Sequence, residues 1–148
     1  MDHIMGFFSA LRTELAFYLG ALNLYEELSR RSAPVSFPRP AASGEQRCSF
    51  QGLYDVCLSL KTDKPVMGNT VCADQHGLVI VTGANQGGKS PLLRSIGLSQ
   101  LMMQAGLFVP AEQFSASVCA DLSTHYKREE DNTLNKHQNI YGTQKKFF

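Results

Sequence analysis

The segment LVIVTGANQGGKS, residues 78–90, most constrains the fold of this 148-residue chain. Four apolar residues run unbroken over Leu78–Val81, which is typical of a strand buried on both faces of a parallel sheet. Gly83 follows almost at once, and Gly88-Lys89-Ser90 completes the G-x-x-x-x-G-K-S pattern of a phosphate-binding loop. An apolar helix is predicted next, over Leu92–Ala105. The order strand, loop, helix is the context in which this pattern is specific.

The chemistry of phosphate binding explains the residue types in this loop. Backbone N–H groups close around an anion only where side chains do not obstruct them, which favours Gly87 and Gly88. The start of the following helix adds a partial positive charge. We expect Lys89 to reach the β- and γ-phosphates and the Ser90 hydroxyl to complete a Mg²⁺ shell. The predicted nucleotide-binding set is Gly83, Ala84, Asn85, Gln86, Gly87, Gly88, Lys89, Ser90 and Pro91, with Ser90 also the predicted metal ligand.

Periodicity predicts the remaining elements. Apolar residues recur at alternating steps of four and three from Ile4 to about Ser29, which indicates a long helix, either packed on the body or extended as a coiled-coil arm. Residues 32–49 contain three prolines and are predicted to be a partly extended linker. Alternation over residues 54–61 predicts a half-buried strand, and residues 122–126 a further one. Residues 50–126 are therefore expected to form an open α/β sheet with 78–81 as a central strand.

Composition excludes several classes of protein. With 14 basic and 13 acidic residues, the net charge of +1 creates no global field that attracts nucleic acid or an anionic membrane. The four cysteines are widely spaced and form no C-x-x-C pair, so reduced thiols in the cytoplasm are expected rather than a disulfide scaffold or a zinc site. No apolar run approaches the roughly 20 residues that a membrane helix needs. The N-terminus has no basic region before its apolar stretch, so no signal peptide is predicted.

The loop and its flanks resemble the ATPase core of the MutS family of DNA mismatch-repair proteins, in a divergent bacterial form. That family follows an apolar strand with T-G-x-N-x-G-G-K-S-T and then a helix that ends in G-x-x-V-P-A. Three other segments, ELAFYLGALNLYEEL, GNTVCADQHG and THYKREEDNTL, are similar to the core helix, the lead-in to the loop strand and a later loop of the family. The matching positions are Thr82, Gly83, Asn85, Gly87, Gly88, Lys89, Ser90, Gly106, Val109, Pro110 and Ala111.

The resemblance implies an α/β fold with a partial ABC-type P-loop NTPase sheet, preceded by a long N-terminal helix. It divides the chain into a helical segment like the end of the MutS core domain (1–31), the Pro-rich linker (32–49), a partial ATPase domain (50–134) and an unrelated or disordered tail (135–148). It also implies ATP and Mg²⁺ as ligands, and a homodimer or a full-length MutS-like subunit as partner. In the family, mismatched DNA is bound by domains N-terminal to this region, which 31 residues cannot contain.

Three departures from the family pattern qualify this expectation. Pro91 replaces a threonine, removes a backbone N–H and disfavours the α conformation of Ser90. The family commonly places an aromatic residue for adenine stacking near Val66 and Met67, and none is evident there. The acidic second strand of a P-loop ATPase has only a weak candidate, Val118–Asp121, so we expect the true one to begin beyond Phe148.

Two functions remain open at this level. The first is an ATP-binding fragment of a MutS-like ATPase that has the Walker A loop and lacks Walker B, with no catalytic residue of its own. The second is a non-catalytic remnant that serves only to associate with a full-length partner. A small P-loop kinase is disfavoured because no lid arginines or acidic strand follow the loop.

Overall fold

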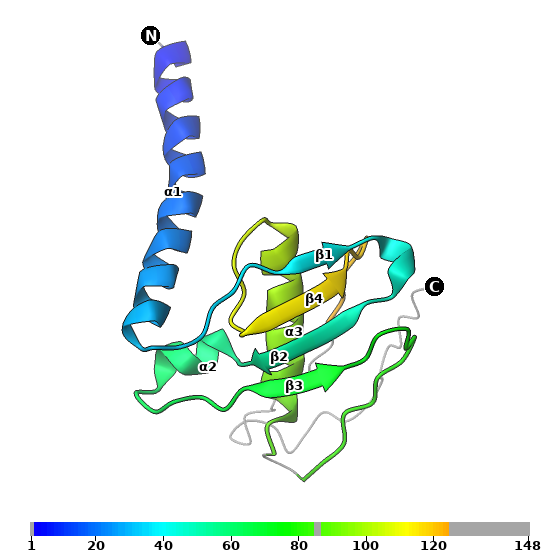
Figure 1. Cartoon of the computed structure of the whole chain (residues 1–148). Helices are drawn as coiled ribbons and strands as arrows, with labels where there is room; N and C mark the ends of the chain where they lie inside the picture. Colours follow the sequence, from blue (N-terminus) through cyan, green and yellow to red (C-terminus); the bar gives the residue numbers. More distant parts are fainter. Residues whose placement is uncertain (1, 85–86, 125–148) are drawn as a thin grey trace, which may run out of the picture.

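The computed structural model describes residues 2–84 and 87–124, which contain the elements of Figure 1. The α-helices are α1 (Asp2–Arg30), α2 (Val56–Lys61) and α3 (Lys89–Gln104), and η1 (Ser43–Glu45) is a short 3-10 helix. The strands are β1 (Arg39–Ala41), β2 (Cys48–Leu53), β3 (Asn69–Cys72) and β4 (Gln113–Ser117). The chain is thus an α/β protein with an N-terminal helix, as predicted.

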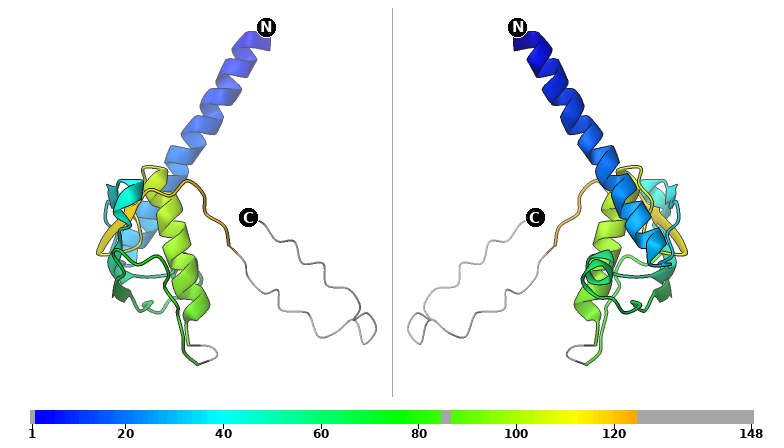
Figure 2. Two further views of the ribbon diagram at one scale, coloured as in Figure 1. Left: turned by 90° about the vertical axis from the view of Figure 1, so that its right-hand side faces the viewer. Right: turned by 90° about the vertical axis from the view of Figure 1, so that its left-hand side faces the viewer.

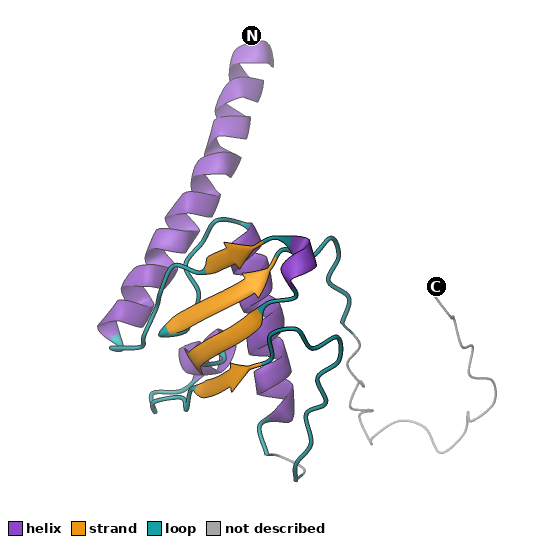
Figure 3. Ribbon diagram, turned by 45° about the vertical axis from the view of Figure 1, so that its right-hand side comes forward, coloured by secondary structure: helices purple, strands orange, loops and turns teal. Residues whose placement is uncertain are grey.

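The four strands form one mixed sheet in the order β1-β4-β2-β3. β1 runs parallel to β4, and β2 is antiparallel to both of its neighbours. α3 crosses one face of this sheet, and Figure 3 shows no other described helix over the opposite face. Phe50 of β2 and Phe114 of β4 are register partners whose rings stack with centroids 6.3 Å apart. The core between sheet and helix consists of Phe50, Leu53, Met103, Val109, Ala111, Phe114 and Ala116.

The prediction of a strand over residues 54–61 is wrong, because most of this segment forms helix α2. The Asp55 carboxylate accepts hydrogen bonds from the N–H groups of Cys57 (3.0 Å) and Leu58 (3.2 Å), which caps the helix N-terminus. The strand lies one segment earlier, in β2. The linker predicted over 32–49 is also more ordered than expected, since it holds β1, η1 and the first residues of β2. Its Pro40 lies in an edge strand, where a missing N–H is tolerated.

The central strand predicted at Leu78–Val81 is not formed. These residues have no strand partner within the described part of the chain, and Leu78 and Ile80 are 75% and 74% exposed. A parallel-sheet strand needs hydrogen-bonding neighbours and a layer on each face, and the sheet of β1 to β4 supplies neither to this segment. No strand forms over residues 118–124 either, and Tyr126 lies outside the described residues.

α1 is confirmed as a helix, but most of it does not pack on the body. Figure 2 shows its N-terminal part projecting away from the sheet, and residues 3–20 are exposed. Contact is confined to the last turns, where Leu28 is fully buried and the Tyr25 ring meets Phe108 edge-on at 5.4 Å. The extended arm therefore describes α1 better than a packed helix.

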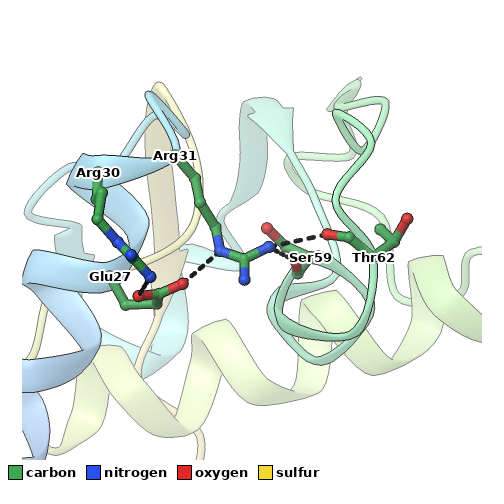
Figure 4. A network of polar contacts seen from close by, with 5 residues as sticks. All are labelled: Glu27, Arg30, Arg31, Ser59 and Thr62. Atoms are coloured by element: carbon green, nitrogen blue, oxygen red, sulfur yellow. Dashed lines mark hydrogen bonds and ion pairs between the residues drawn. The ribbon is translucent and has the colours of Figure 1, made fainter.

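A network of charged and backbone groups fixes the C-terminal end of α1 to α2 (Figure 4). Arg31 donates from Nη1 to the carbonyls of Ser59 and Thr62, each at 2.8 Å, and from Nε to Glu27 Oε1 at 2.6 Å. These carbonyls lie at the C-terminal end of α2, where the helix dipole favours a cation. Hydrogen bonds from Arg31 and then Arg30 lower the pKa of Glu27. The arginine thus sets the direction in which α1 leaves the body.

We predict that Arg31→Ala lowers the free energy of unfolding by about 1.5–3 kcal/mol, because it removes charge-assisted hydrogen bonds that join two elements. The matched control is Arg30→Ala. Arg30 pairs with the same Glu27, but its side chain is 76% exposed and has no bond to α2. We expect a change within about 0.5 kcal/mol for the control. Urea denaturation of both variants measures the difference, and equal losses would contradict the assignment.

Candidate functional site

The glycine loop leads directly into α3. Gly88 has a φ of +83° and is the N-cap of the helix, which begins at Lys89. Gly88 has no side chain that could cap the helix, and among the described residues no side chain accepts a hydrogen bond from the first backbone N–H groups of α3. Together with the helix dipole, this makes the loop an electropositive surface.

Gly87 closes the loop by a backbone hydrogen bond. Its N–H donates to the carbonyl of Ala84 at 3.0 Å. A Cβ on Gly87 would lie only 2.9 Å from the same carbonyl oxygen, so any other residue would force the loop open. The requirement for glycine that the sequence suggested at this position therefore has a geometric cause.

Lys89 points back into the curve of the loop. Its Nζ donates to the carbonyls of Gly83 (2.8 Å) and Ala84 (2.5 Å). The ammonium group is therefore held on the loop side of the helix, where its charge adds to that of the free N–H groups. Loop, helix end and lysine together form one cationic site.

Pro91 does not break the helix. It is the third residue of α3, within the first turn, where the N–H groups have no acceptor inside the helix. The next N–H, that of Leu92, donates to the carbonyl of Gly88 at 3.0 Å. Ser90 is helical and exposed, although the following proline disfavours this conformation. The helix predicted after the loop is therefore formed, and it begins at Lys89, two residues before the proline.

The loop borders a cavity of about 410 Å³. Leu58, Val66 and Met67 supply its apolar wall, and Asp55 and Asn69 are polar members on the other elements. The sequence did not point to Leu58, Asp55 or Asn69 as members of the site. The one signal in the sequence is that Asp55 follows the hydrophobic pair Leu53-Tyr54 and is a residue type that can cap a helix.

Asp55 is a structural carboxylate. It is 3% exposed, and its Oδ2 accepts from Nε of Arg94 on α3 at 2.8 Å, with Nη2 of Arg94 as a further donor. Its Oδ1 caps α2. Both oxygens are therefore engaged, and the residue joins the wall of the cavity to the helix that follows the loop. Among the described residues, no cluster of three or more acidic, histidine or cysteine side chains is placed to hold a metal ion.

The structure brings together most of the predicted site. Gly83, Ala84 and residues 87–91 lie together around the start of α3, whereas Asn85 and Gln86 lie outside the described residues. The acidic strand considered at Val118–Asp121 is absent. The backbone N–H of Cys119 instead donates to Oε1 of Gln104, at the far end of α3 from the loop, with an N···O distance of 2.9 Å.

A smaller cavity of about 200 Å³ lies between the end of α1, α2 and the loop 62–66. Tyr54 lines it and is 2% exposed. Its hydroxyl has no hydrogen-bond partner among the described residues, and burial raises the pKa of Tyr54 to about 12. Val66 borders both cavities, so the two are neighbours.

Comparison with known proteins tests the resemblance to the MutS family that the loop suggested. Residues 79–140 match the family model for MutS domain V, and residues 1–31 match that for the MutS2 N-terminal domain. The chain belongs to the MutS family. Membership fits the glycine loop and the helix α3 that follows it, although residues 125–140 of the match lie outside the described part of the chain.

Individual relatives cover different parts of this MutS-family chain. It is 36% identical over 81 residues to MutS protein homolog 4 of Mus musculus, which is 55% of this chain and 8% of that protein. It is 29% identical over 135 residues to DNA mismatch repair protein MutS of Fervidobacterium nodosum, covering 91% of this chain and 16% of that protein. Endonuclease MutS2 of Enterococcus faecalis is 29% identical over 141 residues, covering 90% and 18%. The chain thus spans less than a fifth of the length of these relatives.

Within residues 2–84 and 87–124, no helix combines the length and the hydropathy that crossing a bilayer requires.

We predict that Tyr54→Phe leaves the protein equally stable or up to about 1 kcal/mol more stable at neutral pH, because a buried hydroxyl without a partner is lost. Above pH 10 the unfolded wild type releases this proton, while the native state keeps it up to about 12. Wild-type stability therefore falls relative to the variant, by up to about 1.4 kcal/mol per pH unit. Denaturation at pH 7 to 11 measures the difference, and a pH-independent difference would refute it.

We predict that Asp55→Ala lowers the free energy of unfolding by about 2–4 kcal/mol, since one cap and one buried charge pair are lost together. Asp55→Asn is the matched variant, because an amide oxygen still caps a helix but cannot pair with Arg94 as a charge. Its loss should be smaller than that of the alanine variant. A larger loss for asparagine would show that the cap contributes little.

Proposed function

We propose that this chain is the nucleotide-binding part of a MutS-like mismatch-repair ATPase and that it binds ATP together with Mg²⁺. The observation that carries the proposal is the position of Lys89, whose ammonium group lies inside the curve of the glycine loop at the open end of α3. A cation, free N–H groups and a helix dipole converge there, which suits a polyphosphate better than any neutral ligand.

Binding would exchange the present contacts of Lys89 for phosphate contacts. The lysine now bonds two neutral carbonyls, whereas a phosphate oxygen offers it a charged acceptor and a stronger hydrogen bond. The apolar wall of Leu58, Val66 and Met67 borders the same cavity and offers a surface for the base. No aromatic side chain is among them, so the base would gain burial without ring stacking.

Mg²⁺ would enter with the nucleotide. Such an ion would neutralise part of the negative charge on the phosphates. The Ser90 hydroxyl, in the first turn of α3, is the protein group that fits it, and phosphate oxygens and water would supply the other ligands. Asp55 also borders the cavity, but its carboxylate is occupied by Arg94 and by the cap of α2. The described residues therefore suit a metal that the nucleotide brings rather than a resident ion.

An association role is the second candidate, and exposed apolar surface favours it. Leu78 and Ile80 of the segment before the loop are exposed, as are Leu93 and Leu101 of α3. We infer that this surface is where the central sheet of an ABC-type ATPase would pack, with α3 between it and the sheet of β1 to β4. Dimer formation and any relation to mismatched DNA would depend on parts of the assembly beyond these residues.

We predict that the chain binds a fluorescent ATP analogue but turns ATP over at a negligible rate, because Asp55 is the only carboxylate on the described walls of the cavity and it is not free to activate water. Lys89→Ala should weaken binding by at least about tenfold. Lys61→Ala is the control, since Lys61 lies at the far end of α2. Equal affinities of the two variants would contradict the site, and steady turnover lost with Lys89→Ala would contradict the inactive state.

We predict that Pro91→Thr tightens the Mg-ATP complex roughly 5- to 150-fold, equivalent to about 1–3 kcal/mol. The variant restores a backbone N–H and relieves the conformational penalty on Ser90. The gain should be larger with Mg²⁺ than with the metal chelated, because part of it acts through the Ser90 hydroxyl. Titration with and without chelator measures this. Equal affinities of variant and wild type would show that the loop tolerates proline, and failure of both to bind would favour the association role.

A further inference from the structure

The cavity beside the glycine loop has two kinds of wall. One is formed by the loop and the start of α3, where the ammonium group of Lys89 lies. The other, the apolar wall, comes from α2 and from the segment that leads into β3, and its members are Leu58, Val66 and Met67. Since the cationic wall suits the phosphates of a nucleotide, the apolar wall is the surface left for the base.

Outside the loop and the first turn of α3, the described polar side chains that line this cavity already have partners. The oxygens of Asp55 are engaged by the cap of α2 and by Arg94. Nδ2 of Asn69 donates to the carbonyl of Leu53 at 3.4 Å, and Oγ of Ser95 donates to a carbonyl of its own helix at 2.7 Å. Adenine and guanine differ in the polar groups on their edges, so a site separates them by hydrogen bonds to those edges. The described walls offer the base burial rather than such bonds.

Met67 is the member of the apolar wall that can adapt to different bases. Its neighbour Val66 packs against the core cluster that contains Leu28 and Phe108, which fixes that part of the wall. Met67 instead has an unbranched side chain with three rotatable bonds and a polarisable thioether that makes favourable contacts with aromatic rings. Every purine presents such a ring, so the contact does not depend on the groups at its edge.

A close approach of two glycines sets the position of Met67. Gly68 follows it, and a Cβ on Gly68 would lie 2.7 Å from the carbonyl carbon and oxygen of Gly52. Gly52 has a φ of +63° and lies where the pairing of β2 with β3 shifts register, between Phe50 and Leu53. Any larger residue at position 68 would force the segment before β3 away from β2, and Met67 would move with it.

We propose that the apolar wall holds the base of a purine nucleoside triphosphate through Met67 and does not distinguish adenine from guanine. This inference rests on the proposed function, since it names the class of nucleotide that the same site accepts. An apolar surface separates ligands of similar shape only weakly, whereas a hydrogen-bonded edge separates them by orders of magnitude. Most of the affinity then comes from the phosphates at the loop, and the base adds a smaller part through the thioether contact.

The first test compares ligands of the full chain. Displacement of a ribose-labelled fluorescent ATP analogue in the presence of Mg²⁺ gives the dissociation constants of ATP, GTP and inorganic tripolyphosphate. We expect ATP and GTP to agree within about threefold, because the apolar wall makes no edge contact that separates them. Tripolyphosphate should bind about 3- to 30-fold more weakly, which is the part of the affinity that the base supplies.

The second test compares variants. Met67→Ala should weaken ATP and GTP about 3- to 10-fold and leave tripolyphosphate within about twofold, since only the base contact is lost. Gly68→Ala should give the same split by displacing Met67. The matched control is Gly77→Ala, because a Cβ on Gly77 meets nothing within 4 Å. It should change each dissociation constant by no more than about twofold. Circular dichroism would confirm that the variants keep their fold, and Met67→Ala carries the test alone if Gly68→Ala does not.

The outcomes separate this inference from the proposed function. An affinity for ATP more than about tenfold above that for GTP would overturn the inference and leave nucleotide binding at the loop in place. An equal loss of ATP and tripolyphosphate in Met67→Ala would do the same, because the methionine would then act on the fold rather than on the base. Failure of all three ligands to bind would overturn the proposed function and the inference together.

Discussion

The pairing of Asp55 with Arg94 is the interaction on which the arrangement of the site depends. Asp55 starts α2, Arg94 lies on the helix that begins at the glycine loop, and the pair is almost completely buried on the carboxylate side. A buried carboxylate is costly unless it is fully hydrogen-bonded, and here the cap of α2 and the guanidinium group together meet that requirement. Because α2 carries one wall of the cavity, this pair sets the position of that wall relative to the loop.

The rest of the structure is built on α3. One face of the helix packs on the sheet of β1 to β4, and the glycine loop leads into its N-terminus. At its C-terminal end, Oε1 of Gln104 accepts a hydrogen bond from the backbone N–H of Cys119. The other face carries exposed leucines. A helix that is apolar on more than one side is typically covered on more than one side. The sheet of β1 to β4 covers one side of α3, and the exposed leucines form a second apolar side that the described residues leave uncovered.

Elements with a local cause were predictable from the sequence. The loop and α3 follow from a motif whose glycines, lysine and helix start act within a few residues of one another, and α1 follows from its periodicity. The elements that failed depend on distant partners. Residues 54–61 alternate like a strand, but the cap at Asp55 and its buried pairing with an arginine 39 residues away favour a helix. Leu78–Val81 has the composition of a buried strand without the neighbours that would make it one. The cavity wall could not be predicted either, since Leu58 and Asn69 approach the loop only through tertiary packing.

The hydrogen bonds that join Arg31 to the C-terminal end of α2 have a mechanical consequence. Leu58, on the cavity wall, belongs to the same short helix whose terminal carbonyls Arg31 holds, and α1 continues from that arginine as a single rigid rod. A rotation of only 5° at this joint would carry the far end of a rod about 43 Å long through nearly 4 Å. A sub-ångström displacement of the wall around a bound molecule would thus be amplified at a distance, which makes the joint between α1 and α2 a lever.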